Sequence, residues 1–231
     1  MQLGRKPLKT HKIQGNKRMK LKLPEFITQH VLIASLIGGL FGMGFILALI
    51  EFDHYTGTEQ FCTTCHSMQL VAEPYYQSAH YMPTSGVRAD CGDCHVSEGV
   101  FAATWDHFIG GKDLLKQIFG ANYDDPVVSA LHLPDAAFAA RKWFKDSDSA
   151  TCKRCHVQDA INGMRPATQQ IHQQETEGKS CIDCHYNLVH RKIPHEKTFK
   201  REAWNQMIEQ EFKLSPGTAA KLMKNNQDET Q

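Results

Sequence analysis

The strongest constraint on the fold of this chain is a pentapeptide, Cys-x-x-Cys-His, that occurs four times and uses all eight cysteines of the 231 residues. Two cysteines at this spacing, with histidine next in sequence, form the attachment motif of c-type haem. The thiols bond one porphyrin, and the adjacent imidazole can bind its iron. We therefore expect four haem c groups, attached through Cys62 and Cys65, Cys91 and Cys94, Cys152 and Cys155, and Cys181 and Cys184, which precede His66, His95, His156 and His185.

Other uses of paired cysteines fit this pattern poorly. A structural zinc site can use two Cys-x-x-Cys elements, but it does not require a histidine directly after each pair. Disulfide bonds would have to use the same thiols, since the motifs leave no cysteine over. Haem attachment is the interpretation that accounts for all four copies.

The spacing of the motifs indicates an internal repeat. Cys62 and Cys91 are 29 positions apart, Cys152 and Cys181 are also 29 apart, and the two pairs are offset by 90. Duplication of a two-haem unit explains this pattern. Porphyrins would supply much of the core of such a domain. We therefore expect a mainly α fold with much irregular structure, with helices near residues 112–119, 135–145 and 200–213.

One long apolar segment precedes the motifs. Val31–Ile50 contains 20 residues, and Ser35 is its only polar side chain. As a helix it spans about 30 Å, the thickness of a bilayer core. A cleaved signal peptide has a shorter run that ends in small residues, so we expect an uncleaved transmembrane anchor. Small residues at four-residue spacing would also let two such helices pack closely as a homo-oligomer; they are Ala34, Gly38 and Gly42.

Charge is distributed unevenly along the chain. Residues 1–30 contain eight basic residues and one acid, whereas the remainder contains 18 basic and 24 acidic residues. Basic residues before the anchor predict a cytoplasmic N-terminus and a periplasmic domain on a bacterial inner membrane. The acidic balance of the large domain argues against a nucleic-acid partner. The expected parts are a basic tail (1–29), a transmembrane anchor (30–51), a tetrahaem domain (52–195) and a polar C-terminal extension (196–231).

Low-spin haem iron needs a second strong axial ligand, and histidine is the commonest choice. Seven histidines outside the motifs and the N-terminal region are candidates, and spacing alone does not choose among them. They are His54, His80, His107, His132, His172, His190 and His195.

Taken together, these features resemble the tetrahaem quinol dehydrogenases of the NapC/NirT/NrfH type. The resemblance covers about residues 25–195. It rests on the anchor, the motif spacing, the start Cys-Thr-Thr-Cys-His-Ser-Met and the run Gly86–Val96. It implies one anchor helix followed by a compact tetrahaem domain built from two dihaem repeats.

The resemblance also implies a set of iron ligands. Met68, rather than His66, is the implied proximal ligand of the first haem, and the other three motif histidines serve their own haems. The implied distal ligands of the second, third and fourth haems are His190, His107 and His80. His132, His172 and His195 are left as non-ligands, although His172 occupies in the second repeat about the place that His80 occupies in the first. Histidine at position 107, where nitrite-reductase-linked members can have lysine, favours the nitrate-reductase-linked NapC type.

The function that the resemblance implies is oxidation of a membrane quinol, either menaquinol or ubiquinol. The electrons would pass to a periplasmic reductase or its cytochrome subunit. The first haem has an open side in this family, and Lys112 and Asp113 are the implied residues for quinol contact and proton uptake.

Three other functions remain open at this stage. The chain could relay electrons without a quinol site of its own. It could instead donate to a nitrite, trimethylamine oxide or other reductase. A reductase of small molecules is the least favoured, because the sequence contains no separate catalytic domain.

Overall fold

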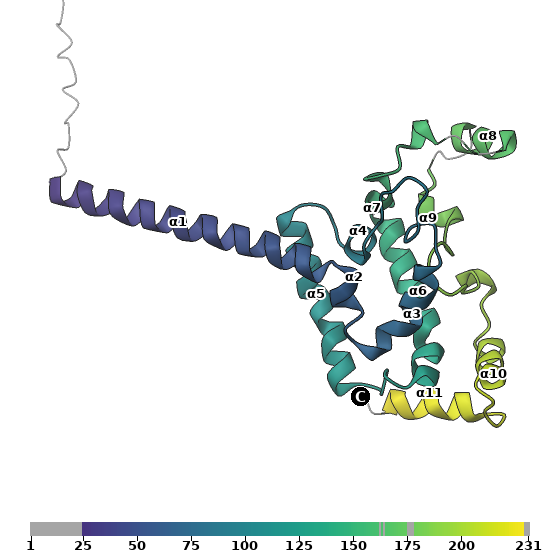
Figure 1. Cartoon of the computed structure of the whole chain (residues 1–231). Coiled ribbons are helices and arrows are strands. Elements are labelled where there is room, and N and C mark those ends of the chain that lie inside the picture. The colour runs from purple at the N-terminus through teal and green to yellow at the C-terminus, as the bar shows by residue number, and fades with distance from the viewer. Residues whose placement is uncertain (1–24, 162, 164, 175–177, 229–231) are drawn as a thin grey trace, which may run out of the picture. The chain divides into compact units, whose positions relative to one another are not determined.

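The computed structural model describes residues 25–161, 163, 165–174 and 178–228, so most of the basic tail lies outside the described residues. The described part is helical and contains no strand, as expected (Figure 1). The helices are α1 (Glu25–Thr56), α2 (Glu59–Cys62), α3 (Gln69–Tyr76), α4 (Cys91–His95), α5 (Val100–Phe119), α6 (Pro126–Asp146), α7 (Ala150–Lys153), α8 (Pro166–Gln174), α9 (Cys181–Cys184), α10 (Arg201–Glu211) and α11 (Thr218–Asp228). Short 3-10 turns are η1 (His66–Met68), η2 (Gln158–Ala160) and η3 (Glu196–Thr198).

The chain divides into two units, residues 1–45 and residues 46–231. Helix α1 begins in the first unit, and its last turns belong to the second. It has 32 residues, about 48 Å at 1.5 Å per residue. Its part Thr28–Thr56 is long and apolar enough to cross a bilayer, and none of its most apolar 18-residue window is buried. It fits a membrane anchor, and the segment Val31–Ile50 lies inside it.

In each repeat, the second motif lies on a short helix whose start has the same kind of hydrogen-bonded cap. Asp90 and Asp93 form a capping box around the start of α4, and Ser180 and Asp183 form one around α9. Such boxes satisfy two backbone N–H groups that the first turn of a helix leaves unpaired. The shared cap supports the duplication that the motif spacing indicates.

Each of these short helices is also bonded to the segment before the first motif of its repeat. The N–H of Gly92 donates to the carbonyl of Gly57 at 2.7 Å, and the N–H of Ile182 donates to Ser149 Oγ at 3.2 Å. A Cβ at Gly92 would lie 2.8 Å from Gly57 Cα. The first repeat therefore needs glycine here, because two backbones meet at a distance that leaves no room for a side chain.

Helix α6 leads directly into the third motif. Asp125 caps its start by accepting hydrogen bonds from two backbone N–H groups, and Pro126 takes the first helical position, where a missing N–H costs nothing. After α6 ends, Asp148 and Ser149 adopt left-handed conformations with φ near 50°. This turn starts α7, which contains Cys152.

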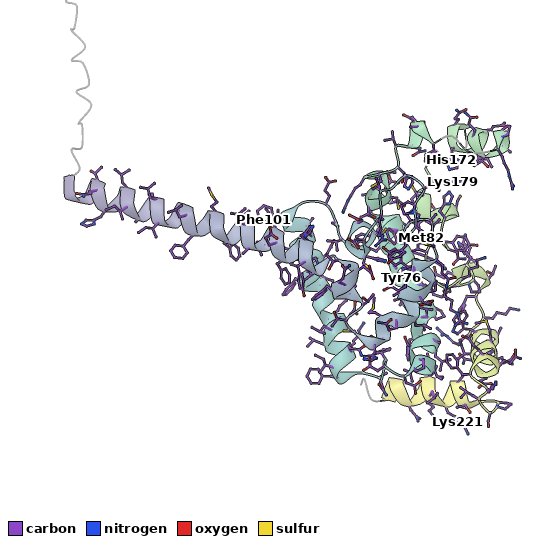
Figure 2. All side chains as sticks on the ribbon, viewed as in Figure 1. Tyr76, Met82, Phe101, His172, Lys179 and Lys221 are labelled. Atoms are coloured by element: carbon purple, nitrogen blue, oxygen red, sulfur yellow. The ribbon has the colours of Figure 1, made fainter. Side chains whose placement is uncertain are left out.

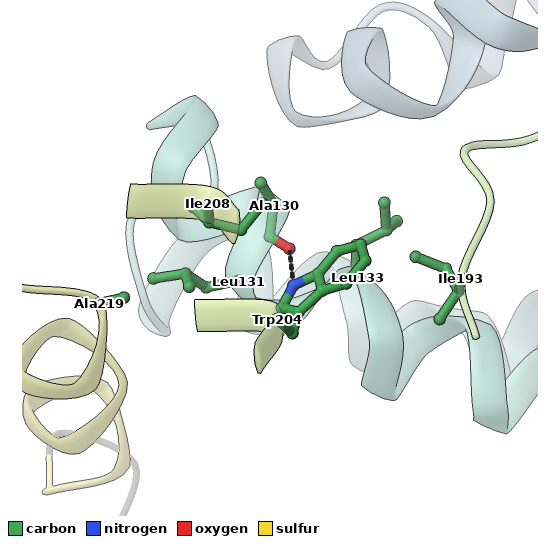
Figure 3. Packing of buried hydrophobic residues seen from close by; sticks show 7 residues of the cluster. All are labelled: Ala130, Leu131, Leu133, Ile193, Trp204, Ile208 and Ala219. Atoms are coloured by element: carbon green, nitrogen blue, oxygen red, sulfur yellow. Dashed lines mark hydrogen bonds between the residues drawn. The ribbon is translucent and has the colours of Figure 1, made fainter. Parts of the chain in front are cut away.

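The main hydrophobic core lies where α6 meets the C-terminal helices (Figure 3). Trp204 is 4% exposed, and its indole Nε1 donates to the carbonyl of Ala130 at 3.0 Å. Ile208 is fully buried, and the Glu209 side chain accepts a hydrogen bond from the N–H of Ala219 in α11. The sequence predicted a polar C-terminal extension with one helix near residues 200–213. The structure instead shows two helices that complete the core.

Few apolar side chains are buried elsewhere. Among the described residues only twelve hydrophobic side chains are buried, and many large ones are exposed. A domain of this size normally buries far more apolar surface in order to offset the entropy of folding. This small core fits a domain whose interior is completed by porphyrins.

Candidate haem-binding site

Each cysteine pair lies on a short helix or on the turn that follows one. Cys62 ends α2, and the chain turns through Cys65 into η1. Cys91 and Cys94 lie within α4, Cys152 lies in α7, and Cys181 and Cys184 bound α9. One helical turn places two thiols three positions apart on the same side, as one porphyrin requires. All eight thiols are free of disulfide bonds.

Thiols of successive motifs lie close together. The thiols of Cys62 and Cys91 share a hydrogen bond, which lowers the pKa of Cys62 and, together with burial, raises that of Cys91. Burial, followed by the nearby Cys152 thiol, raises the pKa of Cys94 to about 11. The described residues contain no group of three or more metal-binding side chains of the kind that a zinc site needs. The close thiols therefore belong to motifs that are consecutive in the chain, and they do not form one metal-binding cluster.

Three of the four motif histidines face a second histidine ring. The ring centroids are 6.1 Å apart for His156 and His80, 6.0 Å for His95 and His190, and 6.0 Å for His185 and His172. An imidazole nitrogen bonds a metal at about 2 Å and lies about 1 Å from its ring centre, so two rings on one iron have centroids about 6 Å apart. The three pairs therefore fit haem iron bound between two histidines.

Hydrogen bonds hold two of the remote histidines by their Nδ1 atoms. Nδ1 of His190 lies 2.9 Å from the carbonyl of Val71, and Nδ1 of His172 lies 2.8 Å from the carbonyl of Thr168. Such a bond to a carbonyl fixes the ring and makes Nε2 the nitrogen that binds a metal. Burial, with a smaller effect from His190, lowers the pKa of His95 to about 4. The neutral imidazole that this favours is the form that ligates metals.

His107 has a different environment. Its Nε2 lies 2.7 Å from Thr56 Oγ1, and its Nδ1 lies 2.9 Å from the carbonyl of Ala103 and 3.2 Å from Asp53 Oδ1. Both ring nitrogens are therefore engaged by protein atoms. The structure places this ring at the junction of α5 and the end of α1, not beside His156, where the resemblance implied it. His80 likewise lies beside His156 instead of the fourth motif.

His172 is the histidine that the sequence argument left out and the structure brings to a motif. It lies on α8 (Figure 2), 13 residues before the histidine of the fourth motif. A signal for it was present, because it occupies in the second repeat about the place that His80 occupies in the first. In the described residues no second histidine ring is paired with His66, and Met68 lies two residues after it in η1, partly exposed.

The residues implied for quinol contact lie on the exposed surface of α5. Asp113 accepts a hydrogen bond from Lys116 Nζ at 3.0 Å, and both side chains are more than half exposed. Lys112 is also exposed. Neighbouring positions on a helix point about 100° apart, so Lys112 and Asp113 face different directions.

Four cysteine pairs on short helices, with histidine rings paired across three of them, define a c-type cytochrome that carries several haems. The comparison with known proteins specifies the family. The chain belongs to the NapC/NirT cytochrome c family, since the model of the N-terminal region of that family matches residues 26–196. Helices α10 and α11 lie outside this match.

Individual relatives agree with this assignment. The cytochrome c-type protein TorC of Escherichia coli K12 is 33% identical over 165 residues, which cover 68% of this chain and 42% of TorC. NapC of Haemophilus influenzae is 35% identical, and the match covers 70% of this chain and 80% of NapC. A probable tetraheme cytochrome of Nitrosomonas europaea is 34% identical, with 69% of each chain covered. The chain thus spans less than half of TorC but most of NapC. No solved structure matches it significantly.

Proposed function

We propose that this chain oxidises membrane quinol and passes the electrons to a periplasmic terminal reductase or its cytochrome subunit. The observation that carries the proposal is the position of the first attachment motif. Helix α1 ends at Thr56, six residues before Cys62, and the Cys62 thiol contacts the Thr56 carbonyl at 3.7 Å. A group attached there lies at the edge of the bilayer, where quinol is dissolved. The N-terminus then lies in the cytoplasm and the haem domain in the periplasm.

The geometry supports a specific set of iron ligands for four haem c groups. We assign His95 and His190 to the second haem, His156 and His80 to the third, and His185 and His172 to the fourth. Met68 is kept as the protein ligand of the first haem, with its opposite side open. Two of the three histidine pairs join residues from different repeats, so ligation would also hold the two repeats together.

Within this proposal the haems supply one-electron redox chemistry, and the protein residues bind quinol and accept its protons. Asp113 is the proposed proton acceptor, because a carboxylate can take a proton as the quinol loses electrons. The hydrogen bond from Lys116 Nζ holds the Asp113 carboxylate on this face of the helix. Lys112 would contact the quinol from the adjacent face of α5.

We propose a periplasmic nitrate reductase as the electron acceptor, but not because of His107. Histidine at position 107 favours this acceptor only if it binds iron, and the two hydrogen bonds of the His107 ring remove that support. The remaining support for a nitrate reductase is the match to NapC of Haemophilus influenzae, which covers four fifths of the NapC chain. Donation to a nitrite, trimethylamine oxide or other reductase is the alternative, and assays with each purified reductase distinguish them.

The proposal is tested by mixing the oxidised protein in detergent with a reduced menaquinol or ubiquinol analogue and recording haem absorbance. We expect rapid haem reduction by at least one of the two quinols. Reduction no faster than in free haem c peptides would leave an electron relay without a quinol site as the correct description.

The role of Asp113 gives a quantitative prediction. Asp113→Asn is expected to slow quinol-driven haem reduction by at least ~10²-fold, the lower limit for loss of a proton acceptor. Reduction by dithionite should not change. Asp146→Asn is the matched control, because Asp146 forms a similar exposed ion pair with Lys142 on α6. Equal rates of quinol-driven haem reduction in the two variants would show that Asp113 is not the proton acceptor of the quinol site.

A further inference from the structure

Helix α5 carries an apolar face that no part of the described protein covers. Its large side chains recur at alternating spacings of four and three residues, the pattern of one side of a helix. The face consists of Phe101, Trp105, Phe108, Lys112, Leu115 and Phe119, and its five apolar members are between 57% and 80% exposed. Figure 2 labels Phe101 at the start of this face.

The opposite side of α5 is the one that packs on the domain. Ala103 is 1% exposed, and His107 makes its hydrogen bonds from this side. Leu114 continues the same side, where a porphyrin can cover it. The aromatic face therefore points away from the side of α5 that packs on the rest of the domain.

The size of this face indicates a large partner. Four exposed aromatic side chains present on the order of 500 Å² of apolar surface, at the upper end of what a soluble protein leaves uncovered. Trp105 and Phe108 also stack on each other, with ring centroids 5.6 Å apart. Aromatic side chains of this kind gather at the boundary between hydrocarbon and water.

The place of α5 identifies the partner. Within the second unit α5 crosses the last turns of α1 (Figure 1), and the His107 ring contacts Phe52, Asp53 and Thr56 there. Phe52 and Tyr55 on these turns are themselves more than half exposed. The apolar face thus continues an aromatic surface that begins where the anchor helix ends.

We propose that α5 lies in the headgroup region of the leaflet from which α1 emerges, with this face turned into the bilayer. Lys112, in the middle of the face, keeps its ammonium group at the level of the headgroups while its methylene chain stays among the acyl chains. The domain then has two membrane contacts, one spanning and one interfacial, which fix its orientation. The inference does not depend on quinol oxidation.

Photo-crosslinking of the full-length holoprotein tests this proposal. A benzophenone amino acid is placed at position 105 or 108, and at Lys142 or Glu202 as exposed controls. The proteins are irradiated in vesicles of phosphatidylethanolamine and phosphatidylglycerol. We expect the intact mass to increase by one phospholipid at 105 and 108 and to stay unchanged at 142 and 202.

Two results would overturn the proposal. One is lipid addition at 105 and 108 no greater than at the control positions. The other is crosslinking of these positions mainly to a second polypeptide. Unchanged haem absorbance confirms that each variant has folded, and because the readout is a mass, loss of quinol oxidation leaves the result unaffected.

Discussion

His172→Leu is expected to leave all four haems attached while one of them changes from low spin to high spin. The His172 ring faces the fourth-motif histidine at a centroid distance of 6.0 Å and an interplanar angle of 26°. Leucine has no atom that can bind iron, so the fourth haem would lose one axial ligand. Electron paramagnetic resonance of the oxidised protein measures the change as an additional high-spin signal.

His107→Leu is the decisive comparison for that experiment. Both nitrogens of His107 already bond protein atoms, so no haem should change spin state in this variant. The loss should appear as reduced stability, about 1 kcal/mol for each hydrogen bond removed. If His107→Leu produced the high-spin signal and His172→Leu did not, the ligand set implied by the family resemblance would be correct.

Trp204→Ala is expected to destabilise the protein by about 3–5 kcal/mol, the usual cost of removing a large aromatic side chain from a core. The variant also loses the indole hydrogen bond and leaves the Ala130 carbonyl buried without it. Urea unfolding in detergent, followed by circular dichroism, measures the change.

Glu202→Ala provides a control on the same helix, because the Glu202 side chain is exposed. Its effect on unfolding should stay below about 1 kcal/mol in detergent. Unfolding of Trp204→Ala at the same urea concentration as the unaltered protein would mean that the C-terminal extension contributes nothing to the fold.

Features that depend on residues close together in the sequence could be predicted. The attachment motifs, the repeat, the anchor and the helical class all follow from local spacing and composition. The helix expected near residues 112–119 is part of the longer α5, and the expected helices near residues 135–145 and 200–213 correspond to α6 and α10.

The pairing of remote histidine rings with the motif histidines could not be predicted in the same way. His80 and His156 are 76 positions apart, and His95 and His190 are 95 apart. Nothing in the spacing says which remote histidine the tertiary structure brings to each motif. The position of His172 in the second repeat was the one local indication that it pairs with a motif. The family resemblance implied instead that it is not a ligand.

The polar composition of the C-terminal segment gave no indication that it forms part of the hydrophobic core. Helix α10 is mostly polar. Its only buried apolar side chains are Trp204 and Ile208, and the partly buried Phe212 follows just beyond the helix end. A narrow stripe of this kind suffices when the facing helix supplies Leu131 and Ala130. Polar segments are expected to be disordered when they lack such a partner, and the sequence does not show where the partner lies.

The ligand assignments and the proposed function both require iron porphyrins that are attached covalently through the paired thiols. The most direct measurement is the intact mass of the denatured polypeptide after extraction with acidified acetone, which removes haem that is bound only by coordination. We expect the mass of the chain plus four haems, with an iron-porphyrin absorbance that stays with the protein. A mass equal to the bare polypeptide would contradict it.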